Sequence, residues 1–116
     1  MADNVAVFEV KQYMVIWRQV EIRDFEGIEV RIRGIVRCFG DEHTMDLMFL
    51  AEDSNIPAPT YHPDQKKGYM FLPMSDLTGM VDLLRNEKPI YAHLRGDKPE
   101  WTSITTSNEP VGEGEE

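Results

Sequence analysis

Residues 75–85 read SDLTGMVDLLR, and they are the one stretch of the chain with a clear helical pattern. Four apolar residues in this stretch recur at intervals of three and four positions, which places them on one face of an α-helix. These residues are Leu77, Met80, Val81 and Leu84. Ser75 is a favourable N-cap, and Pro89 prevents the helix from continuing. The segment therefore predicts a single helix that packs its apolar face against a sheet.

The residues before this helix favour strands. Residues 5–22 are rich in Val, Ile, Phe, Tyr and Trp, and they carry large apolar side chains on both faces. This segment is longer than a usual strand, so we expect a bend near Lys11 and Gln12. After a turn at residues 24–27, residues 28–37 alternate apolar and charged, which predicts a strand with one buried face. Residues 44–51 predict a third strand, mostly buried.

The remaining elements complete the predicted fold class. Strands are expected at residues 69–72, 89–94 and 100–106, and the last is weakly hydrophobic, which suits an edge strand. We therefore expect an α+β fold with a strongly twisted antiparallel sheet of five to six strands, open or partly closed into a barrel, and one packed helix. In the order and spacing of its elements, the segment 69–107 resembles the second half of bacterial single-stranded-DNA-binding proteins. The succession of several strands followed by a helix also resembles the Whirly-type fold. This resemblance implies an OB-like or Whirly-like arrangement of the sheet.

Length and charge indicate one acidic domain. The chain has 116 residues, one cysteine and a formal net charge of −9, and four of its last eight residues are glutamates. We expect a single globular domain over residues 1–107 and a disordered acidic tail over residues 108–116. The negative charge argues against nonspecific binding to phosphate or anionic lipid. Without a long apolar stretch or a secretion signal, we expect a cytoplasmic protein with no membrane partner.

The sequence contains no recognisable motif for a catalytic nucleophile, a phosphate-binding loop or a metal site. We therefore expect a non-catalytic protein without a cofactor or a metal. A strand that is apolar on both faces is typical of two-layer packing or of an oligomer interface, and it presents Tyr13 and Trp17 as binding candidates. The leading interpretation is a small soluble interaction domain that self-associates through its first strand, with a second copy or another protein as its partner.

A second interpretation rests on three arginines, Arg31, Arg33 and Arg37, which alternate along one predicted strand. If this strand pairs with the first, the arginines would lie beside aromatic side chains. Cations that follow phosphates and rings that stack on bases are what single-stranded nucleic acid requires. The alternative function is thus a single-stranded nucleic-acid binding module, with the acidic tail as a competing anion. The competing explanation is that the arginines pair with nearby acids on a solvated surface.

The loop at residues 52–68 supplies the last candidates. Three prolines make it irregular, and Tyr61 and His62 are its side chains best suited to recognition. A small enzyme using these two residues with Asp64 is the third interpretation, although the rigid Pro63 works against direct pairing of His62 with Asp64. The lone Cys38 is interpreted as a small buried hydrophobic residue rather than a redox thiol.

Overall fold

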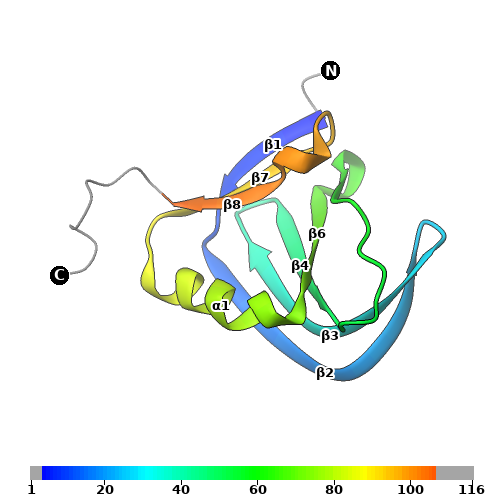
Figure 1. Ribbon diagram of the computed structural model, residues 1–116. Coiled ribbons are helices and arrows are strands. Elements are labelled where there is room, and N and C mark those ends of the chain that lie inside the picture. Colours follow the sequence, from blue (N-terminus) through cyan, green and yellow to red (C-terminus); the bar gives the residue numbers. More distant parts are fainter. Residues whose placement is uncertain (1–3, 107–116) are drawn as a thin grey trace.

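The computed structural model describes residues 4–106, which form an α+β fold of two sheets and one α-helix (Figure 1), and the predicted fold class is confirmed. The strands are β1 (Val5–Glu9), β2 (Gln12–Phe25), β3 (Ile28–Phe39), β4 (Thr44–Leu50), β5 (Thr60–His62), β6 (Lys67–Pro73), β7 (Ile90–Arg95) and β8 (Ser103–Thr106). The helix α1 spans Leu77–Asn86. The expected acidic tail lies outside the described residues. No helix within residues 4–106 has the length and apolar character needed to cross a membrane.

The five-stranded sheet has the order β2-β3-β4-β6-β5. Its first hairpin turns at Glu26 and Gly27, whose φ angles are 52° and 89°. Positive φ at both turn residues matches the right-handed twist of the flanking strands, so the turn predicted at residues 24–27 forms here. The pair β4·β6 is parallel, unlike the antiparallel pairing we expected. The proline-containing segment after β4 ends in β5, which pairs antiparallel with β6 at the outer edge of the sheet, and the chain then turns so that β6 runs in the same direction as β4.

The three-stranded sheet has the order β1-β7-β8. The break between β1 and β2 falls at residues 10–11, next to the predicted bend, and it lets the first apolar segment contribute to both sheets. The strand β8 lies at an edge, as its weak hydrophobicity predicted. The two sheets are not closed into a barrel.

Two irregularities in strand register divide the core. In β2 the register shifts between Trp17 and Glu21, and in β3 it shifts between Ile32 and Gly34. The shift in β2 is by two residues relative to β3, whereas the shift in β3 is by one residue relative to β4. Because a one-residue slip exchanges the faces of a strand, apolar residues on the two sides of the shift in β3 enter different cores. The expectation that residues 28–36 of β3 bury a single face is therefore wrong.

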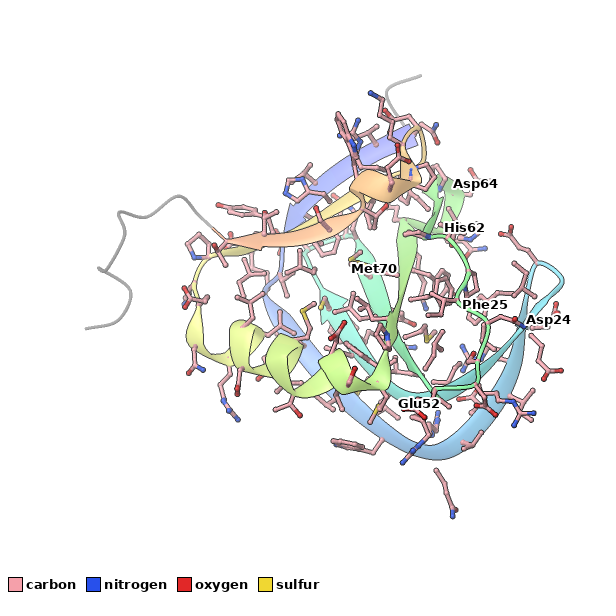
Figure 2. All side chains as sticks on the ribbon, in the orientation of Figure 1. Asp24, Phe25, Glu52, His62, Asp64 and Met70 are labelled. Carbon is pink, nitrogen blue, oxygen red and sulfur yellow. The ribbon has the colours of Figure 1, made fainter. Side chains whose placement is uncertain are left out.

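The larger core lies between the five-stranded sheet, α1 and the three-stranded sheet. Its buried members are Phe8, Val36, Cys38, Met45, Leu47, Phe49, Leu77, Leu84, Ile90, Ala92 and Leu94. The smaller core lies on the other face, where β2 and β3 curl beneath the central strands (Figure 1). Its buried members are Val30, Ile32, Ile35, Met48, Leu50 and Phe71. Phe25 closes this core from the hairpin (Figure 2), with its ring centroid 5.0 Å from that of Phe71.

The N-cap of the helix is Asp76, one residue later than the predicted Ser75. Residues Met74–Asp76 form a 3-10 turn, so Ser75 lies within this turn and makes no capping hydrogen bond. Leu77 and Leu84 are buried in the larger core, as the spacing predicted. Gly79 is exposed, and a Cβ atom placed there would meet nothing within 4 Å. This glycine thus weakens the helix without being needed for close packing.

Candidate interaction surface

The strand β2 is the outermost strand of its sheet and pairs only with β3 among the described strands. It is 14 residues long, so a long row of backbone groups faces away from the sheet. Five of the eight exposed large apolar side chains in residues 4–106 lie on this strand or on its hairpin partner β3. They are Met14, Trp17, Val20, Ile22 and Ile28. We call these five residues together with the open edge of β2 the β2 edge surface.

Trp17 is the most exposed member of this surface, with 65% of its area accessible. Its side chain also lines a groove of about 340 Å³ between β2 and α1, together with Val15, Leu77 and Val81. Asp82 and Arg85 of α1 form an ion pair at the rim of the groove, with 2.6 Å between Oδ1 and Nη2. Tyr13, the other candidate on this strand, is half-buried and packs against the larger core. Of the two predicted aromatic residues, only Trp17 is presented to solvent.

The three candidate arginines do not form one ladder. Arg37 lies opposite Asp46 of β4, on the face of the smaller core. The guanidinium of Arg37 donates two hydrogen bonds to the Asp46 carboxylate, from Nε at 2.7 Å and from Nη2 at 2.9 Å. This hydrogen bonding raises the pKa of Arg37 above its ordinary value. Lys67 Nζ lies 3.3 Å from the same carboxylate, whose side chain is only 1% exposed. Arg37 is therefore committed to a buried ion pair.

Arg31 lies beyond the register shift and Arg33 lies at it, and the two side chains have different surroundings. Arg31 Nε is 3.9 Å from the exposed carboxylate of Asp53, a distance typical of a weak surface ion pair. Arg33 is the extra residue of the β3 bulge, because Ile32 pairs with Leu50 while Gly34 pairs with the next residue, Phe49. Its side chain forms no ion pair with any residue between 4 and 106.

Tyr61 and His62 both belong to the short strand β5, within a segment predicted as an irregular loop. Tyr61 packs against the larger core, whereas His62 faces the hairpin. His62 Nε2 lies 3.9 Å from Glu26 Oε2, and its ring meets the edge of Tyr69 at 5.9 Å. Asp64 follows in a 3-10 turn, and no ion pair joins it to His62 within the described part of the chain (Figure 2). The arrangement places His62 of β5 beside the hairpin tip.

Sequence reasoning missed Asp46 as a structural centre. The turn at residues 40–43 places Phe39 opposite Thr44, and continuing this register backwards places Arg37 opposite Asp46. The length of the turn would therefore have been enough to predict that Arg37 pairs with Asp46, the single acid in the apolar strand β4. Cys38, in contrast, is fully buried as predicted, and burial raises the pKa of its thiol to about 12.

The described residues contain no group of three or more His, Cys, Asp or Glu side chains that could hold a metal ion. Comparison with known proteins adds no further assignment. No protein-family model matches the chain, and neither the curated proteins nor the solved structures gave a match. The features of the described residues that bear on function are therefore the β2 edge surface and the charged side chains around it.

Proposed function

We propose that this chain is a non-catalytic interaction domain that self-associates through the β2 edge surface. The observation that carries the proposal is the open 14-residue edge of β2, which bears four of the eight exposed large apolar side chains in residues 4–106. A long edge strand with apolar side chains is a template for pairing with another strand, and soluble proteins usually protect such edges with charges, prolines or covering loops. A second copy of β2 would satisfy the open backbone groups and cover Trp17.

The register shift in β2 suggests which part of the edge would pair. Residues 12–17 keep a regular register with β3, and the shift between Trp17 and Glu21 interrupts it. An antiparallel pair of two such regular segments would extend the sheet across the two copies. Trp17 would then lie at the end of the paired segment, where the second copy would cover its exposed side chain.

Light scattering coupled to size-exclusion chromatography, run over a hundredfold range of protein concentration, tests the proposal. We expect a mass that rises from one chain towards two. Met14→Lys should shift the protein towards the monomer, because it places a lysine within the paired segment of the edge strand. The control is Ile56→Lys, which places a lysine at another exposed apolar residue, away from the edge. A monomer at every concentration, or an equal effect of both variants, would contradict the proposal.

A single-stranded nucleic-acid surface has less support. Its three arginines are divided between two faces, and Arg37 is engaged by Asp46. The exposed Trp17 keeps this function testable by titration with an oligothymidylate at low salt. A saturable rise in the fluorescence anisotropy of a labelled oligothymidylate that Trp17→Ala abolishes would favour nucleic acid over self-association as the role of this surface.

A further inference from the structure

We propose that Arg33 anchors a binding site for a small monocarboxylate that carries an apolar group. The first observation is that the other six arginines each lie within 4.0 Å of a carboxylate oxygen. The pairs are Arg18 and Arg23 with Glu21, Arg31 with Asp53, Arg37 with Asp46, Arg85 with Asp82, and Arg95 with Asp97. The chain has 21 acids for 12 bases, yet Arg33 has no carboxylate partner in residues 4–106.

The Nε atom of Arg33 is enclosed but has no hydrogen-bond acceptor among the described residues. A guanidinium stays charged at any physiological pH, so the side chain cannot avoid this cost by losing a proton. An enclosed N–H group without a partner is destabilising, and in folded proteins such a group is usually satisfied by an ordered water, an ion or a ligand. The half-buried cation of Arg33 therefore has an unfilled requirement for an acceptor.

The β3 bulge directs Arg33 away from the regular alternation of the strand. Bulges recur beside binding sites, where they change the direction of one side chain. Here the side chain of Arg33 lines a cavity of about 350 Å³. The other lining residues are Leu50, Ala51, Glu52, Pro73, Met74 and Ser75. This volume lies at the lower end of the range for small-molecule sites.

The composition of the wall defines the ligand. Leu50, Pro73 and Met74 provide apolar contacts. Because Nε is enclosed, the two Nη groups of the guanidinium are the donors that would meet the two oxygens of a carboxylate. Glu52, which follows β4 (Figure 2), lines the same cavity and would repel a dianion such as a phosphate monoester. One positive charge beside one negative rim charge therefore favours a ligand with a single negative charge and a short apolar chain.

Nuclear magnetic resonance of the full chain tests this site directly, because the side-chain Nε–H of arginine gives its own signal. We expect sodium butyrate to shift the Arg33 Nε–H signal and the amide signals of Ala51 and Ser75 saturably, with a Kd of about 1 mM. N-acetylleucine in a parallel titration distinguishes a peptide C-terminus from a free acid as the source of the carboxylate. Inorganic phosphate should bind at least tenfold more weakly, and sodium chloride at equal ionic strength should give no saturable shift.

Two variants complete the test. Arg33→Gln should abolish the butyrate-dependent shifts of the backbone amides, whereas the control Arg31→Gln should keep them. Glu52→Gln should strengthen binding several-fold by removing the repelling charge. The proposal is overturned if neither carboxylate gives a saturable shift, if chloride produces the same shift, or if Arg33→Gln binds butyrate like the unaltered chain. None of these outcomes depends on whether the chain self-associates.

Discussion

Replacing Asp46 by asparagine tests whether the ion pairs of this buried carboxylate stabilise the fold. The carboxylate is 1% exposed and lies against two cations, Arg37 and Lys67. Asparagine keeps the shape of the side chain but removes its charge, and it turns one hydrogen-bonding oxygen into an N–H donor that faces the donors of Arg37. The variant thus leaves two cations together without a compensating charge.

The expected magnitude follows from burial. Removing one partner of a fully buried pair costs about 3–5 kcal/mol. Here Arg37 and Lys67 keep 30% and 25% of their side chains exposed, so water screens part of the loss. We therefore expect the lower end of the range, about 3 kcal/mol, for Asp46→Asn. For a domain of this size the midpoint of thermal unfolding should fall by roughly 12 °C.

Urea and thermal unfolding followed by circular dichroism measure this loss. Asp97→Asn is the matched control, since Arg95 also donates two hydrogen bonds to its aspartate but that carboxylate is on the surface. The control should leave the unfolding midpoint almost unchanged. Adding Arg37→Gln to Asp46→Asn should recover part of the loss, because one uncompensated cation is removed. A loss below about 1 kcal/mol for Asp46→Asn would refute the reasoning that this carboxylate holds the two cations in place.

Three further outcomes follow from burial and local geometry. Burial raises the pKa of the Cys38 thiol from 9.0 to about 12, so the folded state keeps the thiol proton to a higher pH than the unfolded state does. The free energy of unfolding should therefore fall as pH rises through this window, by about 1 kcal/mol between pH 9 and pH 10. Urea unfolding of Cys38→Ala should lack this decline. Gly79→Ala should stabilise α1 by about 1 kcal/mol. Gly68→Ala should destabilise the fold by about 1–3 kcal/mol, because its Cβ would collide with the side chain of Leu94. The midpoint of thermal unfolding should therefore rise for Gly79→Ala and fall for Gly68→Ala. Trp17→Ala should weaken self-association by about 3 kcal/mol, roughly a hundredfold in Kd by sedimentation equilibrium, if the exposed 65% of the side chain is buried between copies.

Local chemistry in the sequence was sufficient for several elements. The hairpin at residues 24–27, the helix face containing Leu77 and Leu84, and the edge position of β8 all follow from patterns within a few residues. Each depends on turn residues, periodicity or hydrophobicity, which a single segment carries by itself. These features could be predicted because no distant contact competes with them.

The same local patterns could not predict which distant strands pair with one another. The parallel pairing of β4 with β6 depends on how residues 51–66 cross the sheet, and a proline-rich segment does not specify its own path. The bulge at Arg33 was equally hidden, since an alternating strand gives no signal of an inserted residue. Consequently the burial of residues in β3 was predictable, but the core that each residue enters was not.

One irregularity of the backbone links the observations on both candidate sites. The shifts in β2 and β3 lie at the same level of the sheet, since Trp17 pairs with Gly34 and Glu21 pairs with Ile32 on either side of them. Bulges bend a strand and increase its twist, so two at one level account for the sharp curl of the hairpin (Figure 1). The shift in β3 divides the arginines between two faces and places Arg33 beside its cavity, and the shift in β2 ends the regular edge at Trp17. The position of each candidate site is therefore set by the point at which the sheet bends, and a change that removed the bulge should disturb both.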